Sequence, residues 1–247
     1  MLKFIGSGSA FNTKLGNTSA YYKEGNEMLL IDCGSNTFQR IKENNLLDGV
    51  EQIHVLITHT HADHVGSLAD LILYLYYSHG EFAKNKITII SPSDTKVNDL
   101  LAINGCIEGL HFSRKILPVT MDIEIESMDM YICFAPTVHV EHISSYRIAL
   151  RIGRYPNSVR MLYSGDATGT YFYNKETLIQ KLETFDIFYV DTCKADYVGN
   201  VHLSLRELTE LIPEEYRHKI WCMHLDEGFD REEAEALGFN VVINEFE

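Results

Sequence analysis

The sequence is poor in the residues that mark several protein classes. Five of its 247 residues are cysteines, an odd number with wide spacings, and no CxxC pair occurs. This disfavours a disulfide framework or a cysteine zinc knot, and it predicts reduced, mostly buried thiols in a cytoplasmic protein. No linker, low-complexity run or fixed-period repeat interrupts the chain, so we expect a single domain over residues 1–247.

Long apolar runs and positive charge are also scarce. The most apolar stretch, residues 68–77, contains Asp70 and is too short to span a bilayer, and the first residues lack the apolar core of a signal peptide. Lys and Arg total 21 against 35 Asp and Glu, a formal net charge of −14. This balance argues against broad nucleic-acid binding. A compact phosphate-bearing substrate remains compatible with it, because bound cations can dominate the local field.

Strand-like apolar runs alternate with helical patterns along the whole chain. Strands are predicted at residues 2–5, 20–23, 28–32, 53–57, 87–91, 122–126, 131–134, 144–152, 159–163, 187–190, 220–223 and 240–243. Helices are predicted at 37–44, 63–77, 94–103, 175–184, 204–212 and 231–237, with Ser204 as an N-cap. This order predicts a layered α/β domain with two β-sheets packed together and helices outside.

The strongest functional signal is the segment His59-Thr60-His61-Ala62-Asp63-His64, which follows an apolar strand and opens a helix. His59 and His61 are two residues apart, so an extended backbone directs both side chains the same way. Asp63 and His64 begin the helix and can serve a second position close by. Imidazole and carboxylate groups are good zinc ligands. Because no cysteine lies nearby, we expect open, catalytic metal sites rather than a closed structural one.

This HxHxDH pattern resembles the signature of the metallo-β-lactamase superfamily, whose fold is a four-layer αββα sandwich. The resemblance extends from Gly6 to His224. It implies a metal-dependent hydrolase with two divalent metal ions, for which zinc is expected and manganese or iron are alternatives. The implied ligands are His59, His61 and His139 for the first ion and Asp63, His64 and His224 for the second, with Asp166 bridging the two.

Three of these assignments have rivals in the sequence. His142 lies three residues after His139. We prefer His139 because its spacing to the following Tyr-Arg pair resembles the ribonuclease Z-like branch of the superfamily. Asp166 has the alternative of a simple turn residue, and His224 that of a core histidine at a strand end.

Other segments resemble the same ribonuclease Z-like, phosphodiesterase-type branch. They are the glycine-containing opening at residues 6–11, the triplet Asp32-Cys33-Gly34, the run at residues 145–148, and His202 just before a helix. The resemblance implies that His202 is a non-ligand histidine that assists phosphate chemistry by donating a proton or stabilising charge. Its alternative is a solvated residue at a helix start.

One departure from ribonuclease Z bears on the substrate. Only 26 residues separate His139 from Asp166, which leaves no room for the long arm that ribonuclease Z uses to grip tRNA. Together with the net charge of −14, this points away from extended tRNA binding. We expect a binuclear zinc phosphodiesterase that acts on a small phosphodiester or a short, RNA-like nucleotide through a metal-bridging hydroxide, which Asp63 helps to orient.

Other functions use the same ligand types. A carbonyl hydrolase, such as a lactonase, a thioesterase or a β-lactamase-like enzyme, needs an identical metal site. A non-catalytic metal-binding sensor is disfavoured because every ligand type is present. Electron transfer with iron would need a flavin-binding partner domain, which the chain does not show. Tyr74, Tyr76 and Tyr77 fit core packing, with a homodimer contact or a base-stacking platform as alternatives.

Overall fold

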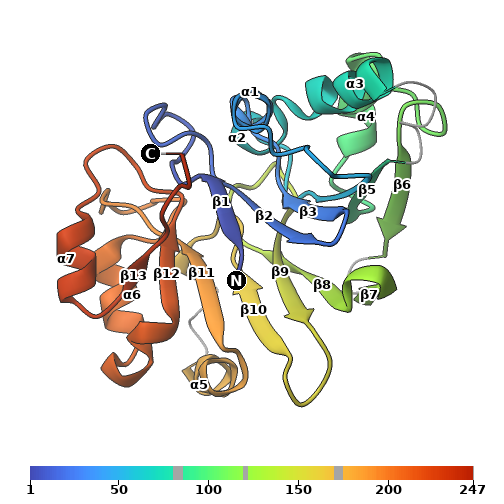
Figure 1. Cartoon of the computed structure of the whole chain (residues 1–247). Coiled ribbons are helices and arrows are strands. Elements are labelled where there is room, and N and C mark those ends of the chain that lie inside the picture. The colour runs from blue at the N-terminus through green and yellow to red at the C-terminus, as the bar shows by residue number, and fades with distance from the viewer. Residues whose placement is uncertain (80–85, 119–121, 170–174, 247) are drawn as a thin grey trace. The chain divides into compact units, whose positions relative to one another are not determined.

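In a computed structural model of the chain, the described residues form two β-sheets and seven α-helices (Figure 1). The structure describes residues 1–79, 86–118, 122–169 and 175–246. The chain divides into two compact units, one formed by Met1–Pro118 with Ile243–Glu247 and the other by Val119–Val242. The single-domain organisation over residues 1–247 stays a prediction.

The first unit contains a six-stranded sheet and four helices. The strands lie in the sheet in the same order as in the sequence. They are β1 (Lys3–Gly6), β2 (Ser19–Glu24), β3 (Glu27–Ile31), β4 (Gln52–Leu56), β5 (Ile87–Pro92) and β6 (Ser113–Leu117). Its helices are α1 (Thr37–Glu43), α2 (Ala62–Val65), α3 (Leu68–His79) and α4 (Val97–Ile103). The strands from β1 to β3 pair antiparallel, and those from β3 to β6 pair parallel.

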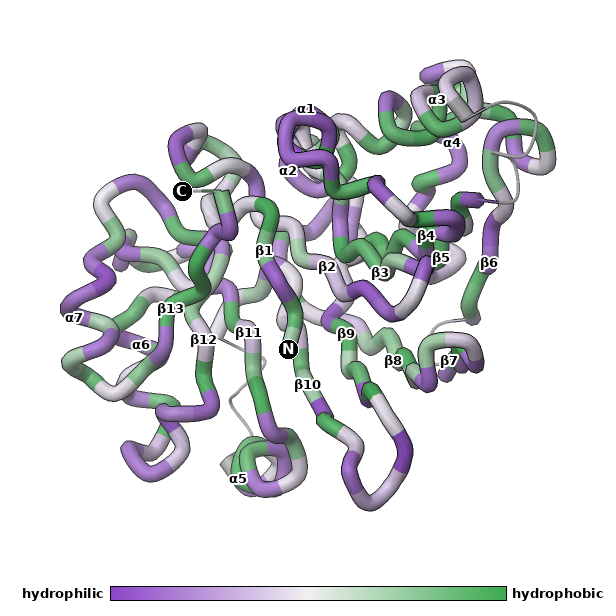
Figure 2. Tube along the Cα trace, in the orientation of Figure 1, coloured by the Kyte–Doolittle hydropathy of each residue, from purple (hydrophilic) through white to green (hydrophobic). Residues whose placement is uncertain are grey.

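The middle strands of this sheet hold the core of the first unit. Four of the five residues of β3 are buried, and Figure 2 shows β3 largely in the colour of hydrophobic residues, while β4 and β5 mix hydrophobic with polar residues. Strands of a parallel sheet are usually covered on both faces, so they read as nearly continuous apolar runs. The core cluster also includes Leu68, Leu71, Ile72 and Leu75 of α3, which repeat at helical spacing.

The second unit contains a seven-stranded sheet in the order β13-β12-β11-β10-β9-β8-β7. These strands are β7 (Asp122–Ile125), β8 (Met130–Thr137), β9 (Ser145–Ile152), β10 (Val159–Tyr163), β11 (Ile187–Asp191), β12 (Ile220–Met223) and β13 (Asn240–Val241). Its helices are α5 (Lys175–Thr184), α6 (Leu205–Leu211) and α7 (Arg231–Ala236). The strands from β7 to β10 pair antiparallel, and those from β10 to β13 pair parallel.

Most predicted elements lie where the sequence patterns indicated, and two strands differ. The strand β6 was not predicted, because Ser-Arg-Lys-Ile-Leu shows neither alternation nor a continuous apolar run. The last strand ends at Val241 instead of continuing to residue 243. Ser204 is confirmed as the N-cap of α6, since its Oγ accepts from the Glu207 amide in a capping box.

The helix predicted at residues 63–77 is wrong as a single helix, because α2 and α3 are separate. The break falls at Gly66 and Ser67. A Cβ at Gly66 would lie 2.4 Å from the Ser35 hydroxyl, and the Ser67 hydroxyl accepts from the Phe38 amide while donating to the Gly34 carbonyl. These contacts fix the turn that carries the metal motif against the segment after β3.

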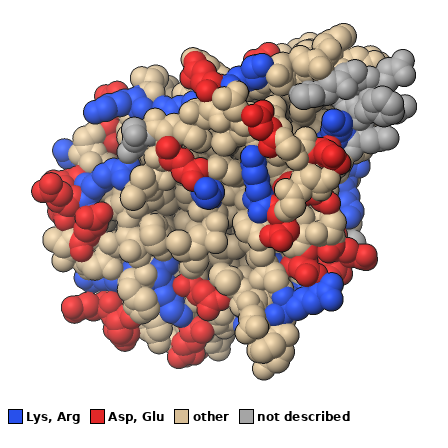
Figure 3. Space-filling view, in the orientation of Figure 1, with Lys and Arg blue, Asp and Glu red and all other residues tan. Residues whose placement is uncertain are grey.

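The cysteines agree with the sequence analysis. All five thiols are free, and four of them are buried. Acidic and basic side chains are interspersed over the face shown in Figure 3. None of the helices in the described part of the chain combines the length and apolar character needed to cross a bilayer.

Candidate metal centre

The first unit gathers four predicted ligands at the end of β4. The strand ends at Leu56, and the buried residues that follow lead to His59, which has no exposed surface. Its Nε2 lies 3.0 Å from Nδ1 of His61, and its ring centroid lies 4.0 Å from that of His64. The Asp63 and His64 side chains approach within 3.3 Å in the first turn of α2. The motif therefore concentrates three imidazoles and one carboxylate in one place.

Asp32 supports this cluster from behind, a role that the sequence analysis did not assign. Its fully buried carboxylate accepts from the backbone and hydroxyl of Thr58 at 2.8 and 2.7 Å, and it lies 2.8 Å from Nδ1 of His64. Burial raises the pKa of Asp32, and its contacts with His64 and Thr58 oppose that rise. With Nδ1 held, His64 presents Nε2 to a ligand, which is how carboxylates orient metal-binding histidines.

The second unit brings its acids and one histidine to the ends of three neighbouring parallel strands. Asp166 follows β10, Asp191 ends β11 and His224 follows β12. The registers pair Tyr163 with Tyr189 and Asp191 with Met223, so the three strand ends lie side by side. The carboxyl ends of parallel strands are where such folds place functional groups.

His139 reaches the same place from the segment after β8. Its Nε2 lies 3.7 Å from Oδ2 of Asp166, and Nε2 of His224 lies 3.4 Å from the same oxygen. The Nδ1 of His139 lies 3.2 Å from the Val201 carbonyl. His139 is buried and burial lowers its pKa, an effect that Asp166 opposes. The rival residue His142 is exposed, which favours His139 as the ligand.

His202 is held by Asp191, a residue that the sequence analysis missed. Nδ1 of His202 lies 2.7 Å from Oδ2 of Asp191, which also accepts from the Ala167 amide at 3.1 Å. Burial by itself lowers the pKa of His202, but the Asp191 carboxylate outweighs it, and the pKa is raised overall. Asp191 itself is buried, with Oδ1 3.3 Å from Nδ1 of His224. A strand-end acid after buried residues, the same signal as Asp166, would have found it.

The segment that carries His202 is braced at several points. A bridge between Cys193 and Ser204 closes it. Inside, the Asn200 side chain donates to the Ala195 carbonyl at 2.8 Å and accepts from the His202 amide at 3.1 Å. These bonds fix the backbone of His202, so the orientation of its ring does not depend on the Asp191 contact alone.

The donor atoms within each unit fit divalent metal ions. Nitrogen and oxygen atoms that share a tetrahedral zinc with bonds of about 2.0–2.1 Å lie about 3.4 Å apart. The separations between His64 and Asp63 (3.3 Å), His224 and Asp166 (3.4 Å), and His139 and Asp166 (3.7 Å) are close to that value. In the second unit, Asp166, Asp191, His202 and His224 each offer a ligand-type atom within 4.8 Å of the others.

Comparison with known proteins decides the family. A family model described as "Anti-Pycsar protein Apyc1" matches residues 1–246. The chain belongs to the Apyc1 family. A relative with the same name from Bacillus phage BSP38 is 31% identical over 247 residues, covering 93% of this chain and 90% of its own.

Solved structures of lower sequence identity share the fold of this chain. The metallo-β-lactamase fold protein YhfI from Bacillus subtilis superposes with a TM-score of 0.73 at 17% identity, covering 98% of this chain and 95% of its own. A diphosphatase of the PhnP family gives a TM-score of 0.69 at 17% identity over 100% and 97% of the two chains. The predicted metallo-β-lactamase fold and its α/β class are thereby confirmed. The cluster of His and Asp side chains in the second unit offers donor atoms of the types that bind divalent metal ions.

Proposed function

We propose that this chain is a binuclear metal phosphodiesterase that acts on a small phosphodiester, such as a cyclic or dinucleotide-like species. Zinc is the proposed metal. The relatives are named for an action against Pycsar, and we propose the same role for this chain. The proposed ligands are His59, His61 and His139 for the first ion, Asp63, His64 and His224 for the second, and Asp166 as the bridge.

The observation that carries the proposal is the pair formed by His202 and the buried Asp191, next to Asp166 and His224. Hydrolysis of an alkyl phosphodiester expels an alkoxide, which needs a proton as it leaves. A histidine whose Nδ1 is held by a carboxylate keeps Nε2 for that proton transfer. An activated ester or a lactam has less need of such a group, because its leaving group or its ring strain already favours opening.

The connections of the second unit support a small substrate. The turn between β9 and β10 comprises only residues 153–158, so no long arm projects from this part of the sheet. The formal net charge is −14, and long-range repulsion of an extended polyanion follows from it. A compact phosphodiester that binds directly at the metal ions avoids most of that repulsion.

Each residue has a distinct task in the proposed reaction. Divalent ions held by the proposed ligands would lower the pKa of water at the site and would neutralise charge on the phosphate. Asp63 accepts a hydrogen bond from the attacking water and orients it toward phosphorus. His202 donates its Nε2 proton to the leaving oxygen, and Asp191 stabilises the ring orientation in which it does so.

The test is hydrolysis of bis(4-nitrophenyl) phosphate and of 3′,5′-cyclic nucleotides by protein loaded with zinc or manganese. We expect metal-dependent turnover that Asp166→Ala abolishes. His139→Ala should remove activity and weaken metal binding, whereas the matched control His142→Ala should leave both unchanged. A protein that holds two metals, ignores phosphodiesters and opens esters, lactones or thioesters would contradict the proposal.

A further inference from the structure

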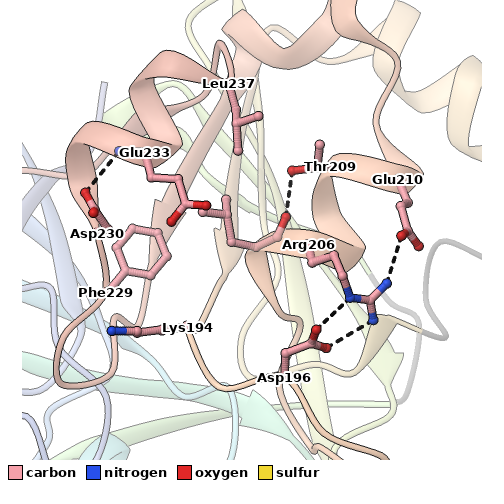
Figure 4. A pocket seen from close by; sticks show the side chains of 10 residues that line it. Lys194, Asp196, Arg206, Thr209, Glu210, Phe229, Asp230, Glu233 and Leu237 are labelled. Atoms are coloured by element: carbon pink, nitrogen blue, oxygen red, sulfur yellow. Dashed lines mark hydrogen bonds and ion pairs between the residues drawn. The ribbon is translucent and has the colours of Figure 1, made fainter.

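A cavity of about 390 Å³ lies in the second unit, and its lining contains none of the proposed metal ligands. Its walls come from the segment after β11, from α6, and from α7 with the two residues before it and Leu237 after it. Figure 4 shows Phe229, Glu233 and Leu237 on one side of the cavity and Arg206, Thr209 and Glu210 on the other. The volume lies in the lower part of the range for small-molecule sites.

The net charge of the cavity lining is unfavourable for binding an anion. Its lining carries four carboxylates and two cations, a net charge of −2. The Arg206 guanidinium is already engaged, because it donates to Asp196 at 2.6 and 3.0 Å and to Glu210 at 2.8 Å (Figure 4). A phosphate or a nucleotide would therefore meet carboxylates without a guanidinium to bind it.

Among the described residues, two carboxylates of the lining have no cation partner: Asp230, which caps the N-terminus of α7, and Glu233. The backbone amide of Glu233 donates to the Asp230 carboxylate at 3.0 Å, but none of the described residues pairs with the Glu233 side chain. The nearest lysine in the lining is Lys194, whose Nζ packs over Gly228, where a Cβ would lie 3.4 Å away. Glu233 thus offers an anion beside the apolar surface of Leu205, Phe229 and Leu237.

From this arrangement we propose that the cavity binds a small organic cation, an ammonium group carried on an apolar body. The ammonium group pairs with Glu233, and the face of Phe229 adds a cation–π contact. The apolar body packs on Leu237, which is only partly buried, and on the small exposed part of Leu205. The site is distinct from the metal centre and does not depend on the proposed phosphodiesterase function.

The probe is butylammonium, with butyrate and butanol as anionic and neutral analogues of the same length. Titrated into the metal-loaded, ¹⁵N-labelled chain at constant ionic strength, butylammonium should shift the amide signals of residues 194–196, 205–210 and 229–237 saturably, with a millimolar Kd. Loss of the charged partner in Glu233→Gln should raise that Kd about tenfold. Glu232→Gln, a neighbouring carboxylate on α7 that does not line the cavity, should leave it unchanged.

Three outcomes would overturn the site. One is a butylammonium response that does not saturate. Another is butyrate binding as tightly as butylammonium. The third is an equal loss of affinity in both variants, since that would show general attraction to an acidic surface instead of a defined pocket. The amide spectra of the variants report their folding in the same experiment, so a folding defect would be seen directly.

Discussion

Replacing Asp191 with asparagine should remove the charge that holds His202 while changing the side-chain volume very little. Asp191 Oδ2 lies 2.7 Å from Nδ1 of His202, and an amide NH₂ at that position would face the imidazole N–H. A hydrogen bond to a charged group contributes about 1.5–3 kcal/mol. Since about 1.4 kcal/mol corresponds to a factor of ten in rate, kcat/KM on a cyclic nucleotide should fall about 10- to 150-fold.

The leaving group separates proton donation from a general structural defect. The 4-nitrophenolate of bis(4-nitrophenyl) phosphate leaves without help, whereas the alkoxide of a cyclic nucleotide needs a proton. The loss in Asp191→Asn should therefore be larger for the cyclic nucleotide. Because Asp191 Oδ1 also lies 3.3 Å from Nδ1 of His224, the variants are compared at saturating metal. Under that condition, the same substitution in a His202→Ala background should cost little more, because groups that act as a unit are not additive.

Asp186→Asn provides the matched control. Asp186 precedes β11, where its carboxylate accepts from the Arg160 amide at 2.8 Å, while Asp191 lies at the other end of the same strand. The control should keep wild-type kinetics. The reasoning would be refuted if Asp191→Asn lowered both substrates equally and added its full loss to that of His202→Ala.

Three further predictions concern other parts of the chain. Asp32→Asn should weaken metal binding about 10- to 100-fold in competition with a chelator, because a buried carboxylate that orients a ligand is lost; unchanged affinity would exclude that role. Gly34→Ala should lower both metal content and melting temperature, since its Cβ would lie 2.0 Å from the Asp63 carbonyl oxygen. Burial tends to raise the pKa of Glu245, but its hydrogen bonds with Lys3 and Tyr21 outweigh burial and lower that pKa overall. Ionised Glu245 therefore stabilises the fold at pH values above its ordinary pKa. This stabilisation is lost as the pH falls through the lowered pKa of the folded state. Glu245→Gln should therefore lower the free energy of unfolding, measured with urea, by at most about 1 kcal/mol at pH 7 for this partly exposed pair. Near pH 2 it should have no effect. A loss of stability that persisted at low pH would contradict the ion pair.

Much of the fold and the metal motif could be predicted from local sequence. The buried strand before His59 reads as an apolar run, and the run of three histidines and one aspartate is specific because few other functions need those groups so close together. The capping box of α6 is equally local, since Ser204 and Glu207 are three residues apart. Such patterns need no knowledge of distant residues.

The partners of the histidines were decided only by tertiary structure. Asp32 meets His64 because β3 and β4 pair in parallel with Ile31 opposite Leu56. Asp191 meets His202 because β11 ends beside β10 and β12, and because a braced segment returns to the strand end. Neither pairing has a signal in local periodicity, because a strand pattern shows which face is buried but not which strand lies alongside.

Tertiary structure also decided the strand β6 and the cavity beside α6 and α7. Ser113–Leu117 forms a strand because it pairs with β5 at the edge of its sheet, although its own residues carry little strand signal. The cavity lies between three segments that are separate in the sequence, namely the segment after β11, α6 and α7 with its flanking residues. Chemistry carried by neighbouring residues can be read from sequence, whereas chemistry assembled across strands and helices depends on long-range packing that a single sequence does not specify.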